Sequence, residues 1–379
     1  MIYLDHAATT PLAPEALEAM LPWLRDRFGN PSSIHQWGRE ARAALDHARD
    51  QIAAALGADY AEIIFTSSGT EADNLALQGV MQAAPPGRRH LVVSAIEHPA
   101  VMATARALEA QGFPFTVVPV DGQGFVDPDQ LAASVRDDTA LVSVLHASNE
   151  IGAIQDIPLL AAAAHARGAL FHTDAVQSFG SLPVNVRDLG VDLLTVSAHK
   201  LYGPKGVGAL WVRAGVPLIP CIRGGTQERE RRAGTENVAG IVGFAAAAAL
   251  AMEQREEESA RLVRLRDGFI ARLEERIEGI RLNGPRTRRL PNNVNVAISG
   301  VDGAAALLSL DRAGIAASSG SACSSGAIEP SPVLQAIGLP PQLAASGIRF
   351  TLGRSTKEAD LEQAAEALAG IVDRLRGAE

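Results

Sequence analysis

Short apolar runs recur along this chain and alternate with longer, alanine-rich stretches. Short apolar runs between turn residues are typical of buried strands, and the stretches between them have the length of helices. The alternation predicts a mainly parallel sheet that is covered by helices on both faces. The predicted strands are residues 91–95, 115–120, 141–145, 169–173, 191–196 and 207–212.

The pattern changes near residue 253. A charged helix through Arg276 is followed by a strand at 293–298, another helix, a strand that contains Arg349 and a terminal helix. This order predicts an α+β second domain that the N-terminal arm completes, and a length of 379 residues suits two domains. We therefore predict a large domain over residues 13–252 and a small domain formed by residues 1–12 and 253–379.

The most apolar long segment, Asn237 to Met252, is shorter than the ~20 residues that a transmembrane helix needs, so a buried helix is predicted there. The first residues lack the basic start and apolar core of a secretory signal. Two cysteines in the whole chain exclude a disulfide scaffold and fit a reducing compartment. We expect a cytoplasmic protein with no membrane association.

The formal net charge of −9 argues against a general nucleic-acid binder, which needs a basic surface to neutralise phosphates. A metalloenzyme is disfavoured as well, because no helix-spaced ligand pair accompanies His172 and Asp174. We predict no metal site.

Lys200 ends the segment Ser197-Ala198-His199-Lys200, which follows the apolar run 191–196. It is therefore predicted at the carboxyl end of a strand, where a turn presents its amine to a cleft. An amine partly withdrawn from water loses its proton more readily and can form a Schiff base, the bond by which pyridoxal phosphate (PLP) attaches to enzymes. The alternative is a solvated charge at a strand end.

Asp174 ends the preceding predicted strand. A carboxylate that faces the ring nitrogen of PLP keeps that nitrogen protonated, so that the ring can act as an electron sink. Gln177 would point the same way if a helical turn follows, and it could donate to the phenolate oxygen of the cofactor. The alternatives are a helix N-cap for Asp174 and a surface position for Gln177.

A predicted strand at 63–66 runs through small polar residues into a helix. Free N–H groups and the helix dipole suit a phosphate there, with Gly69 permitting close approach and Thr70 adding a hydroxyl. Ser197 and His199 would supply further donors. Ser68 and Glu71 also form a capping-box pattern, which needs no ligand.

Two histidines follow other predicted strands. His98 could stack on a pyridine ring and transfer protons near neutral pH, although a structural role is the alternative. In the segment 146–150, Asn149 is a candidate hydrogen-bonding group for substrate or cofactor, and His146 is interpreted as structural.

The two cysteines differ in their surroundings. Cys221 lies among apolar residues, where a cysteine is usually a small buried hydrophobe, and we assign it no role. Cys323 lies in Ser319-Gly320-Ser321-Ala322-Cys323-Ser324, a stretch of small and polar residues that predicts a mobile, exposed loop. A thiol there could act as a nucleophile that carries a group to another protein, whereas an incidental surface cysteine is a liability that proteins tend to avoid.

These residues together resemble the cysteine desulfurases of the NifS and IscS type, PLP-dependent members of the class-V aminotransferase family. The resemblance extends over the whole chain, from Tyr3-Leu4-Asp5-His6-Ala7-Ala8-Thr9-Thr10 through Phe28-Gly29-Asn30-Pro31-Ser32-Ser33 to Ile348-Arg349-Phe350-Thr351-Leu352-Gly353-Arg354. It implies a homodimer of PLP-dependent fold type I, with a mainly parallel seven-stranded sheet in the large domain. The SSGSAC segment resembles the IscS/NifS branch of the family.

The resemblance also implies a role for each candidate residue. Lys200 would bind PLP covalently, Asp174 would pair with the ring nitrogen and Gln177 with the phenolate oxygen, and His98 would stack on the ring and transfer protons. The phosphate would lie at Gly69 on Thr70, Ser197, His199 and, across the dimer interface, Thr235. Asn149 and Arg349 would hold the substrate carboxylate, and Arg349 suits this role because a guanidinium binds carboxylates with two hydrogen bonds.

The implied reaction converts L-cysteine to L-alanine. Lys200 removes the Cα proton, and the Cys323 thiolate takes the sulfur as a persulfide for an acceptor protein in iron–sulfur, thio-cofactor or tRNA biosynthesis. Another PLP enzyme, such as an aminotransferase, a kynureninase or a selenocysteine lyase, would share Lys200 and Asp174 without needing Cys323. A non-catalytic sulfur-transfer scaffold would be expected to have lost Lys200 or Asp174.

Overall fold

The main sheet has seven strands in the order β2-β8-β7-β6-β5-β3-β4 in a computed structural model that describes residues 1–319 and 330–377. Strand β8 is antiparallel to both of its neighbours, and the other paired strands are parallel. The predicted mainly parallel sheet is therefore confirmed. Its strands are β2 (Ile63–Thr66), β3 (His90–Ser94), β4 (Phe115–Val118), β5 (Thr139–Ser143), β6 (Leu170–Asp174), β7 (Leu193–Ser197) and β8 (Gly208–Val212).

Alternate residues of each strand point to opposite faces of this sheet, and both faces are apolar. Helices therefore cover both faces. Leu91, Val93 and Leu141 pack with α3 and α4 on one face. Val92 and Val142 pack on the other face with the remaining helices of this domain. The helices are α1 (Pro14–Arg25), α2 (Gln36–Leu56), α3 (Gly69–Ala83), α4 (Pro99–Ala110), α5 (Pro128–Ser134), α6 (Ile157–His165), α7 (Val186–Leu189) and the first half of α8 (Val238–Arg276).

A second, smaller unit contains a three-stranded antiparallel sheet in the order β12-β10-β9 and a two-stranded parallel sheet of β1 and β11. Pairing of β1 with β11 attaches the N-terminal arm to this unit. The predicted strand at 293–298 coincides with β10. The elements are β1 (Ile2–Tyr3), β9 (Ile280–Leu282), β10 (Asn293–Ile298), α9 (Gly303–Arg312), β11 (Ile315–Ala316), α10 (Pro332–Ala336), α11 (Pro341–Ala345), β12 (Ile348–Thr351) and α12 (Glu358–Arg376).

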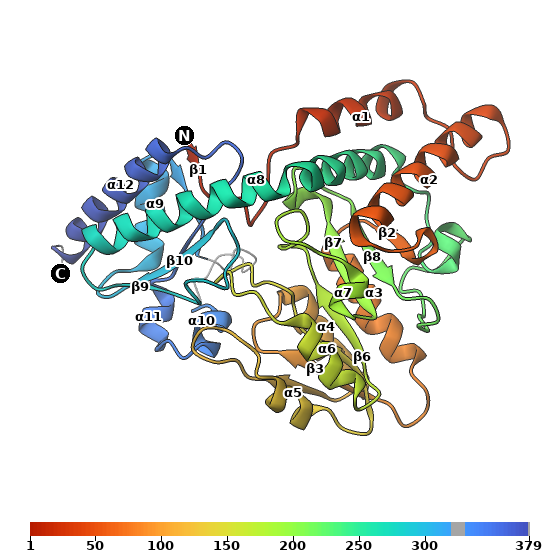
Figure 1. Cartoon of the computed structure of the whole chain (residues 1–379), viewed down its shortest axis with the longest axis horizontal. Coiled ribbons are helices and arrows are strands. Elements are labelled where there is room, and N and C mark those ends of the chain that lie inside the picture. The colour runs from red at the N-terminus through yellow and green to blue at the C-terminus, as the bar shows by residue number, and fades with distance from the viewer. Residues whose placement is uncertain (320–329, 378–379) are drawn as a thin grey trace.

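Helix α8 connects the two units as one continuous helix of 39 residues, visible as the long helix that runs across Figure 1. Its first half, around Phe244 and Ala248, packs in the core of the large sheet. From Leu262 onward, α8 packs in the core of the small unit through its own side chains, among them Phe269 and Leu273. The predicted domain boundary after residue 252 thus falls inside α8, at the part of the helix where its packing partners change.

Helix α8 is also the one helix in the described part of the chain that is long and apolar enough to cross a membrane by length and composition. Its apolar half is buried against α1, α2 and the large sheet. It is therefore a core helix, as predicted for residues 237–252.

Candidate active site

The candidate lysine and aspartate lie at the carboxyl ends of neighbouring strands. Asp174 is the last residue of β6, and its register partner on β7 is Thr195. Strand β7 ends at Ser197 and leads directly into a single 3₁₀ turn, Ala198–Lys200, which carries the lysine. Because β6 and β7 are parallel and adjacent, their ends bring both side chains to the crevice where open α/β sheets bind ligands.

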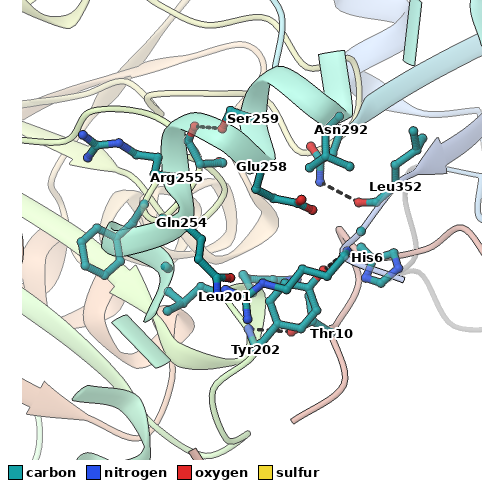
Figure 2. A pocket seen from close by; sticks show the side chains of 18 of the residues that line it. His6, Thr10, Leu201, Tyr202, Gln254, Arg255, Glu258, Ser259, Asn292 and Leu352 are labelled. Carbon is teal, nitrogen blue, oxygen red and sulfur yellow. Dashed lines mark hydrogen bonds between the residues drawn. The ribbon is translucent and has the colours of Figure 1, made fainter. Parts of the chain in front are cut away.

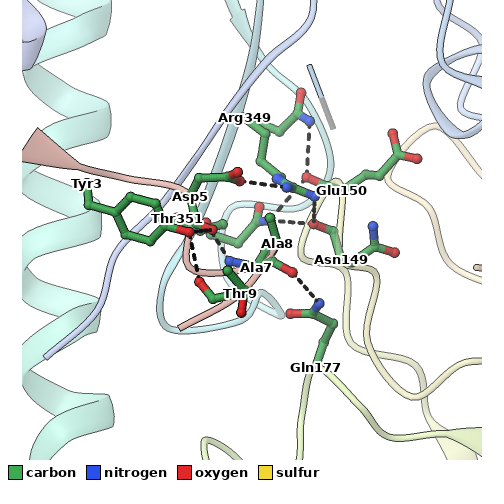
Figure 3. A network of polar contacts seen from close by, with 12 residues as sticks. Tyr3, Asp5, Ala7, Ala8, Thr9, Asn149, Glu150, Gln177, Arg349 and Thr351 are labelled. Atoms are coloured by element: carbon green, nitrogen blue, oxygen red, sulfur yellow. Dashed lines mark hydrogen bonds and ion pairs between the residues drawn. The ribbon is translucent and has the colours of Figure 1, made fainter. Parts of the chain in front are cut away.

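The N-terminal arm covers Lys200. The Lys200 ammonium donates hydrogen bonds to the carbonyl oxygens of Ala7 and Ala8, at 2.6 and 2.8 Å. Gln177, which follows Asp174 in a turn, donates to the same Ala7 oxygen at 3.1 Å (Figure 3). These contacts fix the lysine amine and the Gln177 amide against one segment of backbone.

Asp174, His98 and Lys200 share one electrostatic environment. Burial raises the pKa of Asp174, and the charges of His98 and Lys200 partly oppose this effect. Burial lowers the pKa of His98, while Asp174 raises it and Lys200 lowers it further. The His98 ring caps α4 by accepting a hydrogen bond from the Ala100 N–H at 3.1 Å, so its orientation is fixed.

The junction between β2 and α3 has the features of an anion site. Ser68 caps α3 by accepting from the Glu71 N–H at 3.1 Å. The reciprocal half of the predicted capping box is absent, because the Glu71 carboxylate instead accepts from the Ser67 N–H and pairs with Arg232. Thr70 is exposed at this helix end. The free N–H groups of the first turn therefore face a space that a ligand can reach.

Two further observations mark a cradle beside this helix end. The Ser197 side chain is 1% exposed, and its hydroxyl has no hydrogen-bond partner among the described residues. A Cβ atom at Gly69 would lie 2.9 Å from the Val176 side chain and 3.4 Å from the Ser197 Cβ, so only glycine fits here. An unpaired buried hydroxyl beside a glycine at a helix N-terminus suits a phosphate oxygen.

His199 and His146 are both held neutral. The His199 Nδ1 lies 3.1 Å from the Thr9 hydroxyl, and burial, with Lys200 and Lys205 nearby, lowers the pKa of His199 to about 4. His146 is buried, which lowers its pKa to about 4.

Arg349 and Asn149 meet from different units of the fold. The Arg349 guanidinium pairs with Asp5 at 2.8 Å and donates to the Asn149 carbonyl at 3.1 Å (Figure 3). Arg349 comes from β12, Asp5 from the N-terminal arm and Asn149 from the segment after β5. The two residues predicted to hold a carboxylate therefore meet between the large sheet and the small unit.

A pocket extends behind Lys200 between α8, the N-terminal arm and the segment after β12. Figure 2 shows His6, Tyr202 and Glu258 around it. His6 is almost fully buried, and neither of its ring nitrogens has a hydrogen-bond partner in the described ranges. Burial lowers the pKa of His6 to about 4, so the ring is neutral.

Thr235 and Cys221 lie apart from this group. Thr235 is exposed in the segment that precedes α8. Cys323 lies outside the described residues. The expectation that Cys221 is buried is wrong, because this residue is exposed on a surface segment with its sulfur 3.8 Å from the Asn74 carbonyl.

Sequence reasoning missed three acidic residues near the site. Asp73 is one helical turn after Gly69, so it lies on the helix face that points to the sheet. An acidic residue at such a buried position is unusual, and this could have identified Asp73 from the sequence. Glu97 directly precedes His98 and is buried. Asp5 stands in the opening motif, but its partner Arg349 is 344 residues away and no local pattern indicates the pair.

The residues that the structure brings together fit PLP. An amine, a carboxylate facing the same crevice and a helix N-terminus with an unpaired hydroxyl match its aldehyde, its ring nitrogen and its phosphate. Residues 1–319 and 330–377 contain no cluster of three or more His, Cys, Asp or Glu side chains that could hold a metal ion.

Comparisons with known proteins show which family this chain resembles. Residues 2–364 match the family described as Aminotransferase class-V. The chain is 52% identical to the cysteine desulfurase IscS of Dictyoglomus turgidum over 375 residues, which cover 99% of this chain and 95% of that protein. A solved NifS-like protein superposes with a TM-score of 0.92 at 35% identity, covering 98% of this chain and 99% of that one. The protein SspA in complex with cysteine superposes with a TM-score of 0.83 at 35% identity, covering 93% and 99%.

Proposed function

The chain belongs to the class-V aminotransferase family and is a cysteine desulfurase of the IscS type, so we propose that the crevice around Lys200 is its active site. The observation that carries this proposal is the meeting of Lys200, Asp174 and the Ser197 hydroxyl, which has no partner among residues 1–319 and 330–377, at the carboxyl ends of β6 and β7. The related SspA binds cysteine, which supports L-cysteine as the substrate here.

Members of this family use PLP, which supplies an electron sink for charge that develops on the substrate Cα. In our proposal Lys200 holds the cofactor covalently, Asp174 pairs with its ring nitrogen and Gln177 with its phenolate oxygen. His98 packs against the ring. Gly69, Thr70, Ser197 and His199 surround the phosphate.

Lys200 is the proposed base that removes the Cα proton once its amine is free. The carbonyls of Ala7 and Ala8 can keep that amine oriented, because they accept its hydrogen bonds at 2.6 and 2.8 Å. Arg349 and Asn149 hold the substrate carboxylate and thereby fix the direction of the Cα proton. Burial lowers the pKa of His98 and the charge of Asp174 opposes this effect, so the ring can accept or return a proton in the same crevice.

Cys323 is the proposed sulfur acceptor. Its thiolate attacks the substrate sulfur, a sulfur–sulfur bond forms, and the carbon–sulfur bond breaks with its electron pair remaining on the substrate carbon. Protonation of that β-carbon and return of a proton to Cα complete L-alanine, and the sulfur stays on Cys323 as a persulfide. An acceptor protein then takes this sulfur for iron–sulfur cluster, thio-cofactor or tRNA biosynthesis in the cytoplasm.

A homodimer is the proposed assembly. Seven of the large exposed apolar side chains lie between residues 12 and 37, just before α1, on α1, in the loop after it and at the start of α2: Leu12, Leu17, Leu21, Leu24, Phe28, Ile34 and Trp37. We call this set the α1–α2 apolar surface. An exposed apolar surface of this kind is typical of a protein interface.

The segment that carries Thr235 is anchored to α2 and α3. Glu228 pairs with Arg49 of α2 at 2.6 Å, and Arg232 pairs with Glu71 of α3 at 2.8 Å. Residues 228–230 have positive φ angles of 48°, 56° and 64°, which non-glycine residues rarely adopt. The proposed reason for this strained path is that it presents Thr235 to the phosphate site of the partner subunit.

Two domains are proposed with the boundaries predicted from the sequence, residues 13–252 and residues 1–12 with 253–379. Separate apolar cores support this division, one around the large sheet and one around β10, β12 and α12. A smaller cluster that includes Ile96, Leu145 and Leu334 joins them.

The test is alanine formation from L-cysteine by PLP-loaded protein under reducing conditions. Lys200→Ala and Cys323→Ala are expected to abolish it, whereas the matched controls Lys205→Ala and Cys221→Ala are expected to retain it, because both control residues are exposed. Activity that survives Cys323→Ala would favour a PLP lyase or aminotransferase. Activity that survives Lys200→Ala would overturn the assignment of the site.

A further inference from the structure

Three carboxyl groups lie buried together beneath the proposed cofactor site. Asp174 ends β6, Asp73 lies in the second turn of α3, and Glu97 directly precedes His98. Their exposed fractions are 8%, 1% and 6%. Asp174 lies close enough to Asp73 and to Glu97 to raise the pKa of both by charge repulsion.

The three carboxyls differ in the positive charges available to them. Asp174 faces both His98 and Lys200. In the described part of the chain, no lysine or arginine forms an ion pair with Asp73 or Glu97, and one oxygen of each lacks a hydrogen-bond partner. Glu97 accepts hydrogen bonds from the Ser94 hydroxyl at 2.6 Å and from the Leu145 N–H at 2.8 Å.

His172 is the nearest basic group to Asp73, but it cannot supply a charge. Its Nε2 lies 3.7 Å from the Asp73 carboxyl. The two ring nitrogens already contact the hydroxyls of Ser143 and Thr195 at 2.9 and 3.0 Å. Burial lowers the pKa of His172 to about 3, so the ring is neutral at physiological pH.

An ionised carboxylate without a cation is very costly in such a site. We propose that Asp73 keeps its proton at neutral pH and acts as an uncharged positioning residue, so that Asp174 is the carboxylate that bears the charge facing the cofactor. Burial raises the pKa of Asp73 well above its usual range, and the neighbouring charge of Asp174 raises it further. The Thr195 hydroxyl opposes this effect but does not reverse it.

The consequence concerns Asp174, and it rests on the proposed role of that residue. A charge on Asp73 would raise the pKa of Asp174 and favour its protonation. A protonated Asp174 would lose the negative charge that keeps the ring nitrogen protonated. A neutral Asp73 therefore allows Asp174 to stay ionised in a site where burial works against it.

The test is infrared spectroscopy of the holoenzyme labelled with ¹³C at the aspartate carboxyls, at pH 7. We expect a protonated-carboxyl band that shifts on labelling and disappears in Asp73→Asn. The matched control is Asp192→Asn, since Asp192 is equally buried but pairs with Arg213, and this variant should keep the band. The proposal would be overturned if the wild type showed no protonated-carboxyl band and Asp73→Asn lost a band of an ionised carboxylate instead.

If Asp73→Asn does not fold, Asp174→Asn decides the matter, because Asp73 and Asp174 are the aspartates whose pKa burial raises. The protonated band should survive in that variant, and its loss would contradict the proposal. The role of Asp174 is tested separately by cofactor affinity, which Asp174→Asn should lower at least about 10-fold. Unchanged affinity in Asp174→Asn would refute the proposed site while leaving the infrared assignment of Asp73 intact.

Discussion

Asp5 and Arg349 are joined by an ion pair of 2.8 Å although 344 residues separate them in the chain. The pair connects the N-terminal arm to β12 and lies beside the Asn149 carbonyl, which also accepts from Arg349. The proposed substrate clamp is therefore held in place by the small unit before any substrate binds.

Arg349→Lys is expected to raise the KM for L-cysteine roughly 10- to 100-fold, because an ammonium cannot bind a carboxylate with two parallel hydrogen bonds. Asp5→Asn should raise it about 3- to 10-fold, since only the orienting charge is lost. Steady-state alanine formation measures both. An Arg349→Lys enzyme with the wild-type KM would contradict the assignment.

Ser197→Ala is expected to have opposite effects on the protein with and without cofactor. Without cofactor, removing an unpaired buried hydroxyl should stabilise the fold by about 1 kcal/mol. PLP affinity should fall about 10-fold, because a hydrogen bond to the phosphate is lost. Thermal unfolding and cofactor titration give the two values. A variant that is destabilised without cofactor and binds PLP normally would show that the hydroxyl is structural.

Glu97 should make the cofactor-free protein less stable as pH rises. Burial raises the pKa of Glu97 to about 8, against an ordinary value of 4.5, so the folded state holds a proton that the unfolded state releases. The contribution of the protonated Glu97 carboxyl to the free energy of unfolding is fully present below pH 4.5 and is lost as pH rises through about 8.

Glu97→Gln keeps both hydrogen bonds that the Glu97 oxygen accepts but cannot ionise. Its Tm should therefore gain on that of the wild type steadily between pH 5 and pH 8. The buried histidines, whose lowered pKa values act in the opposite direction, are present in both proteins and cancel in the comparison. A Tm difference that does not change with pH would show that Glu97 is ionised in the folded protein.

A charge on the α1–α2 apolar surface should dissociate the proposed dimer. Phe28, 74% exposed, is the test position, and Leu308 of α9, 64% exposed, is the matched control. Phe28→Asp should sediment as a monomer, with PLP affinity reduced because Thr235 of the partner is lost. Leu308→Asp should remain dimeric. A Phe28→Asp protein that sediments like the wild type would place the interface elsewhere.

Much of the fold could be predicted because a buried strand has a local signature. The strand at 293–298 and the lysine-bearing strand end were found from apolar runs alone. The continuity of α8 could not be predicted in this way. The composition change at residue 253 does not mark the end of a helix. It marks the point where α8 passes from the core that contains Phe244 to the core that contains Leu262.

The site was predictable where a residue follows its own strand, as Lys200 and Asp174 do. Contacts made by distant segments were not predictable, as the Asp5 pair and the Ala7 carbonyl show. Cys221 illustrates the opposite error: apolar neighbours in the sequence do not bury a residue whose segment runs over the surface.

The most direct test of the central claim is mass spectrometry of the PLP-loaded protein after one turnover with L-cysteine in the absence of reductant. The account predicts one added sulfur atom on the peptide that contains Cys323, and none on the peptide that contains the exposed Cys221. Alanine release with no sulfur on Cys323, or with sulfur on Cys221 instead, would contradict it.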